Sequence, residues 1–231
     1  MKIVPVDDSL RASASFGTLR RAWPEIVFHD AISNEHWGRL YSERSEFQFA
    51  LVSHGEVLAE GNSIPVEGMP ASWREAFPNS FGGGTPDRLC ALAVLVDPDH
   101  QGKGLSRVLL EHMRGLAHER GWELVAPVRP SLKHRYPLTP IERYAEWRRD
   151  DGLLLDPWLR THERLGAETL APEPRSLRIT GSVAEWEEWV GMAFPESGEY
   201  TFPGGLTTVA IDREADVGRY WEPNVWMRHA V

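Results

Sequence analysis

Short runs of apolar residues along the chain predict the strands of a sheet. Residues 47–52 alternate in character, and a turn containing Gly55 connects them to residues 57–59, a pattern typical of a hairpin. Residues 89–96 are eight consecutive apolar positions bounded by charged residues and proline, which predicts a central strand buried on both faces. Residues 122–128 form the next predicted strand.

A helical pattern separates the last two of these strands. Six apolar side chains between Leu105 and Ala117 recur at spacings of three and four, which predicts an amphipathic helix. Gly121 provides the signal that ends it. A strand, a helix and a strand within about 40 residues form the unit from which parallel or mixed α/β sheets are built.

Elsewhere the pattern predicts shorter elements separated by loops rich in proline and glycine. These are a short helix near 73–77 inside a loop over 65–88, helices over 140–150 and 157–165, a Trp-rich helix over 183–190, and strands over 176–179 and 225–229. No segment has the composition of a linker between two domains. We therefore expect one domain that spans residues 1–231.

The composition excludes several classes of protein. Hydrophobic residues make up 42% and charged residues 26%, as in ordinary globular proteins, and no apolar run approaches the roughly 18–20 residues that span a bilayer. Residues 1–8 lack the apolar core of a secretory signal. One cysteine, Cys90, cannot form an internal disulfide or a Cys-based zinc site, and the nine histidines show no metal-binding pattern. We expect a cytoplasmic protein with no metal and no membrane association.

The net charge of −9 argues against general binding to nucleic acid, so an anionic ligand would need a local site. Residues 96–110 offer one, because they place a Gly-rich turn between the buried strand and the amphipathic helix. Glycines permit positive φ, and the first N–H groups of a helix have no partners and carry partial positive charge. With Lys103 and Arg107 nearby, this is typical of a pyrophosphate site. A tight turn without a ligand is the alternative; neither a P-loop nor a Rossmann fingerprint fits the spacing.

The segment Gln101-Gly102-Lys103-Gly104-Leu105-Ser106 resembles the acyl-CoA signature of the GNAT acyltransferases, Gln/Arg-x-x-Gly-x-Gly/Ala. Its flanks, 93–99 and 107–110, also resemble that family, and residues 161–167 more weakly resemble the end of the family's Phe-Tyr-x-x-x-Gly-Phe helix. One departure is Ser106, which stands where Gly or Ala is usual.

The resemblance implies an α/β (α+β) fold with a mixed, largely antiparallel sheet flanked by helices. It places a CoA-binding core at about 89–128, with insertions at 129–157 after the fifth strand and at 180–222 before the last. It implies transfer of an acyl group, most simply acetyl, from CoA to a primary amine of a small molecule, and a homodimer is left open.

The resemblance also assigns the binding residues. The backbone of Val94, Leu95 and Val96 is expected to bind the pantetheine arm and polarise the thioester carbonyl. The pyrophosphate is expected on the segment composed of Gln101, Gly102, Lys103, Gly104, Leu105, Ser106 and Arg107. In physical terms, fixed N–H donors stabilise the oxyanion through which acyl transfer passes.

The proton transfers are less well assigned. His162 occupies the position at which the family commonly has the Tyr that protonates the leaving thiolate, and an imidazole is chemically suited to that role. A purely packing role beside Trp158 is equally compatible with the sequence. The positions that carry a general base in some members are Cys90 and Leu92 here, which are unsuited to it, and Pro127 stands near a further one.

Other segments leave alternatives open. The basic loop over 133–136 is compatible with contacts to CoA phosphates or an acidic substrate, or with simple solvation, and residues 222–226 are candidates to line the acceptor cleft. Rival functions are an acyl-CoA-binding module without turnover, an acyl-CoA hydrolase or decarboxylase on the same fold, and a nucleotide-dependent enzyme that uses Gly102 to Gly104.

Overall fold

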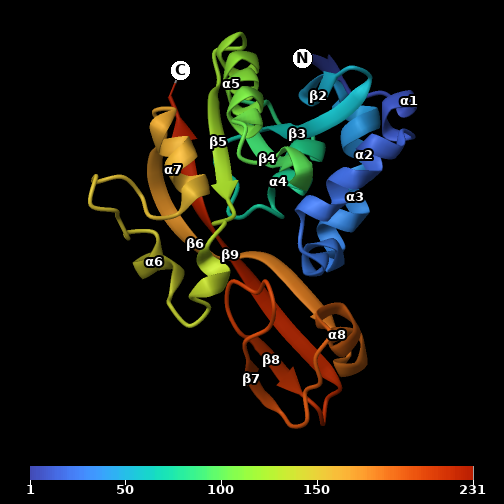
Figure 1. Ribbon diagram of the computed structural model, residues 1–231, viewed down its shortest axis with the longest axis vertical. Coiled ribbons are helices and arrows are strands. Elements are labelled where there is room, and N and C mark those ends of the chain that lie inside the picture. The colour runs from blue at the N-terminus through green and yellow to red at the C-terminus, as the bar shows by residue number, and fades with distance from the viewer. Residues whose placement is uncertain (231) are drawn as a thin grey trace.

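One nine-stranded sheet runs through the whole molecule (Figure 1). The computed structural model describes residues 1–230, and Val231 lies outside the described residues. The strands are β1 (Lys2–Pro5), β2 (Gln48–Ser53), β3 (Glu56–Val66), β4 (Arg88–Val96), β5 (Glu123–Val128), β6 (Glu168–Gly181), β7 (Gly198–Tyr200), β8 (Val209–Asp212) and β9 (Val217–His229). Their order is β1-β2-β3-β4-β5-β9-β8-β7, with β6 on the other edge of β9. Within the described residues only β4 and β5 pair in parallel, which confirms a mixed, largely antiparallel sheet.

Helices cover both faces of this sheet. They are α1 (Asp8–Arg11), α2 (Ala14–Thr18), α3 (Ala31–Glu43), α4 (Ala76–Phe81), α5 (Leu105–His118), α6 (Ile141–Tyr144), α7 (Pro157–Arg164) and α8 (Val183–Val190), together with the short 3-10 turns η1 (Leu19–Ala22), η2 (Glu25–His29), η3 (Ser45–Phe47), η4 (Pro98–His100) and η5 (Lys133–Arg135). Side chains of α5 and α7 share one core cluster with the sheet, and those of α3 and α4 share another on the opposite face. No helix of residues 1–230 is both long enough and apolar enough to cross a bilayer.

The predicted amphipathic helix is α5, and its buried stripe explains why it forms. Leu109, Leu110 and Met113 are fully buried against the sheet, and each contributes about 1.5–3 kcal/mol by leaving water. The helix ends at His118, and Gly121 follows with φ +68°. Because β4 and β5 carry continuous apolar runs on either side of this helix, the predicted strand–helix–strand unit is confirmed.

Other predicted elements differ in extent. The helix expected over 140–150 is wrong beyond its first turn, since α6 ends at Tyr144 and the chain then folds back on itself. The backbone N–H of Leu155 donates to the carbonyl of Trp147 at 2.7 Å, which closes that turn. The strands expected over 176–179 and 225–229 are short pieces of β6 and β9, which run for 14 and 13 residues.

The distal parts of β6 and β9, together with β7, β8 and α8, form a projection that we call the C-terminal lobe (Figure 1). It lies at the opposite end of the molecule from both chain ends. Its core contains Trp186, Phe194 and Tyr220, and Ile26 and Val27 of η2 pack into the same cluster. The lobe therefore supports η2, a segment that borders the site described next.

Candidate active site

The two central strands separate part-way along their length. β4 and β5 pair only at Arg88 with Glu123, Leu89 with Leu124, and Cys90 with Val125. Beyond Cys90, β4 continues to Val96 bonded to β3 alone, while β5 pairs with β9. Over residues 91–96 the edge of β4 that faces β5 therefore has no strand partner, so the backbone N–H groups on that edge are available to a ligand.

A β-bulge in β4 accompanies this separation. Asn62 of β3 lies opposite Ala93 and Ser63 lies opposite Ala91, so Leu92 is the extra residue between them. The carbonyl of Leu92 instead accepts a hydrogen bond from Nε1 of Trp73 at 2.9 Å. A bulge bends and twists the strand locally, which turns the next residues away from β5.

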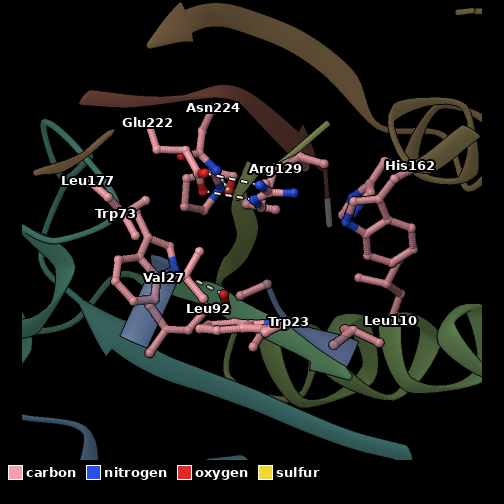
Figure 2. Close-up of a pocket in the computed structure, with 17 residues that line it drawn as sticks. Trp23, Val27, Trp73, Leu92, Leu110, Arg129, His162, Leu177, Glu222 and Asn224 are labelled. Carbon is pink, nitrogen blue, oxygen red and sulfur yellow. Dashed lines mark hydrogen bonds and ion pairs between the residues drawn. The ribbon is translucent and has the colours of Figure 1, made fainter. Parts of the chain in front are cut away.

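A cavity of about 100 Å³ occupies the gap between the strands, and residues from both faces of the sheet line it (Figure 2). His162 and Leu110 lie at one side of it, and Trp73 and Leu177 lie at the other. The remaining lining residues are Trp23, Val27, Ala91, Leu92, Ala93, Val94, Ala126, Pro127, Val128, Arg129, Trp158, Glu222 and Asn224. The cavity therefore lies within the sheet itself, between the α5 face and the face covered by α3 and α4.

A buried ion pair forms one wall of the cavity. Arg129 Nε donates to Glu222 Oε1 at 2.8 Å and Arg129 Nη2 donates to Glu222 Oε2 at 3.0 Å, the two-point geometry of a strong pair. Tyr220 donates a further hydrogen bond to Glu222 Oε2 at 3.1 Å. Burial acts to lower the pKa of Arg129, but the fully buried Glu222 outweighs it and the net shift is upward. The pair is a fixed polar wall in which both groups are engaged.

Asn224 presents an unused hydrogen-bond acceptor to the same cavity. Its Nδ2 donates to the carbonyl of Pro127 at 2.9 Å, which orients the amide because a carbonyl can only accept. Its Oδ1 is buried and has no partner among residues 1–230. An unsatisfied buried acceptor costs about 1–3 kcal/mol, so the site favours a ligand that brings an N–H donor.

His162 reaches the cavity from α7. Asp156 caps this helix by accepting from the N–H of Trp158 at 2.9 Å, and the ring of Trp158 packs edge-on against that of His162 at 4.6 Å. Nδ1 of His162 lies 3.0 Å from Nε2 of His229, whereas its own Nε2 has no partner in the described part of the chain. Burial, assisted by His229, lowers the pKa of His162 well below its usual value, so the imidazole is neutral at pH 7.

The Gly-rich turn has the geometry expected of an anion site. Gly102 and Gly104 both have φ +75°, and Gly104 is the residue from which α5 begins. The backbone N–H groups from Gly102 to Ser106 make no hydrogen bond within residues 1–230, and no side chain caps the helix. Five adjacent free donors at a helix N-terminus favour phosphate.

The side chains of the turn contribute unequally. Leu105 is buried in the core, so it offers only its backbone N–H. Lys103 is exposed, with Nζ 3.1 Å from Nδ1 of His100, and Gln101 donates to the carbonyl of Val96 at 3.3 Å. Arg107 is exposed and pairs with Glu111 at 2.9 Å. Both cations are exposed beside the turn, and Arg107 is already paired with an acidic side chain.

Comparisons with known proteins agree with this geometry. No protein-family model matches the chain. Among curated proteins, the arginine N-acetyltransferase avaD of Aspergillus versicolor is 31% identical over 247 aligned residues, which cover 90% of this chain and 85% of that protein. The chain belongs to the GNAT superfamily of acyl-CoA-dependent N-acyltransferases.

Solved structures share the GNAT fold along the whole chain. The loading GNATL domain of CurA from Lyngbya majuscula matches with a TM-score of 0.68 and 18% identity, over 99% of this chain and 96% of that one. The GphF GNAT-like decarboxylase in complex with isobutyryl-CoA matches with a TM-score of 0.64 and 18% identity, over 100% and 99%. At this identity the similarity concerns the fold, and the predicted GNAT-type sheet is confirmed.

Not every residue singled out from the sequence belongs to the GNAT site. Lys133 is buried and its Nζ donates to the carbonyls of Tyr136 and Leu206 at 2.8 and 2.7 Å, so it holds the loop to the C-terminal lobe rather than facing a phosphate. Cys90 is fully buried, and burial raises the pKa of its thiol far above the usual value, as expected for an inert core residue.

The sequence pattern missed several residues that line the cavity. Trp23 and Val27 precede α3, in a region for which the sequence predicts no element. Trp73 begins the short helix predicted near 73–77, with no role assigned to it in the site. The signal that was available is the excess of tryptophan, since ten in one chain indicates large aromatic surfaces. Which of these tryptophans line the gap between β4 and β5 depends on tertiary packing.

Proposed function

We propose that this GNAT enzyme transfers the acetyl group of acetyl-CoA to a primary amine of a small molecule by direct attack. The observation that carries the proposal is the open edge of β4 from residue 91 to 96, joined to the free N–H groups that begin α5. One continuous stretch of backbone thus offers donors for both the thioester and the pyrophosphate.

The coenzyme is expected to lie along this stretch. The backbone of Val94, Leu95 and Val96 would bind the pantetheine arm, because that edge has no β5 partner. The N–H groups from Gly102 to Ser106 would hold the pyrophosphate, with the Lys103 side chain adding charge. The N–H of Arg107, expected from the sequence to take part, instead donates to the carbonyl of Gly104 at 3.1 Å as part of the helix. Ser106 is only partly exposed and small enough to leave its N–H accessible.

The proposed reaction takes place in the cavity between β4 and β5. The amine nitrogen attacks the thioester carbon, a C–N bond forms, and the carbonyl electrons move to oxygen, where a β4 N–H stabilises the negative charge. When the carbonyl re-forms, the C–S bond breaks and the sulfur leaves as thiolate. The amine loses one proton and the sulfur gains one, so no proton is consumed overall. Deprotonating an ordinary alkyl ammonium at pH 7 costs about 4 kcal/mol.

His162 is suited to stabilise the leaving sulfur. When His229 donates to its Nδ1, the neutral imidazole of His162 carries its proton on Nε2, the nitrogen that faces the cavity without a partner. A hydrogen bond from this N–H to the developing thiolate favours breakage of the C–S bond. We propose this donor role in place of an imidazolium acid, because burial disfavours the charged form.

The amide of Asn224 is placed to orient the acceptor. Its free Oδ1 accepts a hydrogen bond from an amine N–H that enters from the Trp73 side of the cavity. The Arg129–Glu222 pair beside it would keep the polar end of the cavity rigid. Parts of the proposed insertions, residues 129–157 and 180–222, would in this way shape the acceptor site.

Release of free thiol from acetyl-CoA across a panel of amines tests the proposal. The panel begins with arginine, because the related curated protein is an arginine N-acetyltransferase. We expect amine-dependent release with formation of the N-acetyl product. Thiol release or loss of CO₂ from an acyl-CoA without amine would support a hydrolase or decarboxylase instead. Tight CoA binding with no turnover would support a binding module, and stabilisation by ATP or NAD but not by CoA would overturn the site itself.

A further inference from the structure

A second cavity lies directly beside the reaction cavity. Trp23 and Val27 line both, so these two side chains form the partition between them. The second cavity has a volume of about 390 Å³, and its walls come from α2, η1, η2 and α3, and from two residues of the sheet, Glu60 and Leu95. Val94, which precedes Leu95 on β4 and points to the opposite face of the sheet, lines the reaction cavity.

The pairing of β3 with β4 fixes the position of Glu60 relative to residues 94–96, the segment expected to bind the thioester. Its cross-strand partner in the antiparallel pairing of β3 and β4 is Leu95. Side chains of such partners stand on the same face with Cβ atoms about 4.5–5.5 Å apart. The carboxylate therefore faces the side of the sheet on which α3 packs, close to the segment expected to hold the thioester.

The carboxylate of Glu60 is buried, and only one of its two oxygens accepts hydrogen bonds from the described residues. Tyr41 donates to its Oε1 at 2.7 Å and Asn62 donates to the same oxygen at 2.9 Å. Its Oε2 receives no hydrogen bond, and no basic side chain forms an ion pair with it, within residues 1–230. The nearby positive charge is Arg11, which pairs with Asp8 and whose guanidinium lies 4.1 Å from the centroid of the Tyr41 ring. Burial accordingly raises the pKa of Glu60. A buried acid without a counter-charge is costly unless a cation completes it.

Aromatic side chains form the rest of the wall. Trp23, Phe28, Trp37 and Tyr41 all line the cavity, and π faces attract cations. Arg20 also lines it, but both oxygens of Glu25 hold its Nη2 at 3.2 Å and its guanidinium lies 3.6 Å from the centroid of the Phe28 ring. Glu25 therefore already matches the charge of Arg20, and Glu60 is the acidic side chain of this wall that has no ion-pair partner among residues 1–230.

We propose that this cavity recognises the positively charged end of the acceptor, a guanidinium or ammonium group, and that Glu60 is the residue that selects for it. The inference rests on the proposed acetylation of a small amine and deepens it. The acceptor class is an amine with a second, cationic group a few bonds away. Its primary amine enters the reaction cavity past Trp23, while its cationic group binds Glu60 Oε2 against the aromatic wall.

The wild-type enzyme provides the first test, with pairs of amines that differ in charge but hardly in shape. Arginine is compared with citrulline, whose ureido group is neutral, and 1,4-diaminobutane is compared with butylamine. We expect kcat/KM to favour the cationic member of a pair at least about tenfold, as for hydrogen bonds to a charged group. The first pair reports on a guanidinium and the second on an ammonium.

The variant Glu60→Gln then tests the residue. It keeps the shape and an oxygen to accept from Tyr41, but it removes the charge. We expect it to lower kcat/KM for the preferred cationic amine at least about tenfold more than for its neutral partner, mainly through KM. Glu56→Gln is the matched control, because Glu56 lies on the same strand and is exposed. It is expected to preserve the preference.

The outcomes separate this inference from the function on which it rests. If no amine is acetylated although CoA binds, the proposed function fails. If amines are acetylated without preference for a cation, only the inference is overturned. An equal loss for both members of a pair in Glu60→Gln also overturns it. Should that variant not fold, calorimetric binding of arginine and citrulline to the wild-type enzyme decides, since similar affinities contradict the inference.

Discussion

The imidazoles of His162 and His229 face each other with Nδ1 and Nε2 3.0 Å apart, although 67 positions separate them in the chain. His162 lies on α7 and His229 ends β9, so the contact fixes the helix against the last strand of the sheet. Both rings are buried and neutral, and each has one nitrogen with no partner among the described residues.

This pair predicts a loss of stability in mild acid. Burial, together with the nearby charge of Arg114, lowers the pKa of His229 to about 4, and the pKa of His162 is lowered as well. The unfolded chain takes up protons near pH 6.5 and the folded chain does not, so the free energy of unfolding falls as the pH drops from 6.5 towards 4. For His229 alone the loss approaches about 3 kcal/mol.

Urea unfolding from pH 8 to pH 4.5 measures this loss. His229→Gln is expected to lose stability less steeply over that window than the wild type. Parallel curves for the two proteins would show that other groups are responsible.

Replacement of His162 distinguishes its two roles. In His162→Phe we expect kcat to fall by about 10²-fold while the affinity for CoA changes by less than about threefold, because the ring donates to the sulfur only as the C–S bond breaks. Steady-state kinetics and calorimetry on the same preparation give both values. A loss of the same size in both would assign His162 to packing beside Trp158.

The Gly-rich turn offers a substitution with an internal control. Gly104→Ala places a side chain at φ +75°, which costs about 1–2 kcal/mol although nothing lies within 4 Å of the new Cβ. We expect weaker binding of acetyl-CoA, because the relaxed turn no longer aligns its N–H groups. Gly115→Ala in the same helix also meets nothing within 4 Å, has no positive φ and should stabilise by up to about 1 kcal/mol. Calorimetry measures the affinity for acetyl-CoA, and thermal unfolding measures the stability. Equal changes in affinity and in stability for the two variants would contradict this expectation.

The Arg129–Glu222 pair predicts a stability cycle. Arg129→Met leaves the carboxylate of Glu222 buried and unpaired, and we expect a loss of about 3–5 kcal/mol. The double variant Arg129→Met/Glu222→Leu removes both charges and should recover much of that loss. Chemical denaturation of the two variants measures the difference, and a double variant less stable than the single one would refute the prediction.

The Gly-rich turn and the strand and helix on either side of it were predictable from sequence, because their determinants are local. The apolar run of β4, the glycines at 102 and 104 and the stripe of α5 lie within 30 residues, and each follows a rule of backbone geometry or burial. The separation of β4 from β5 was implied only by resemblance to the family. No local pattern records where a strand loses its partner.

The other walls of the cavity were predictable only in part. Residues 222–226 were candidates to line an acceptor cleft, and Glu222 and Asn224 do line the cavity, but they lie within β9 rather than before the last strand, because Pro223 interrupts the pattern that marks a strand. The segment before α3, which contributes Trp23 and Val27, carries no predicted element. A usable signal was present at Glu60, a charged residue that directly follows the apolar residues 57–59 of β3. Its meaning required the register with Leu95, and register is a property of the assembled sheet.

The continuous strand β9 connects the C-terminal lobe to Glu222 and Asn224, which line the cavity. From Val217 to His229 one strand passes from β8 in the lobe, past Glu222 and Asn224, to the histidine contact beside β5. The coenzyme turn has no part in this strand. A change in the lobe can therefore act on the Glu222 and Asn224 side of the cavity through one continuous strand, without passing through the turn that begins α5.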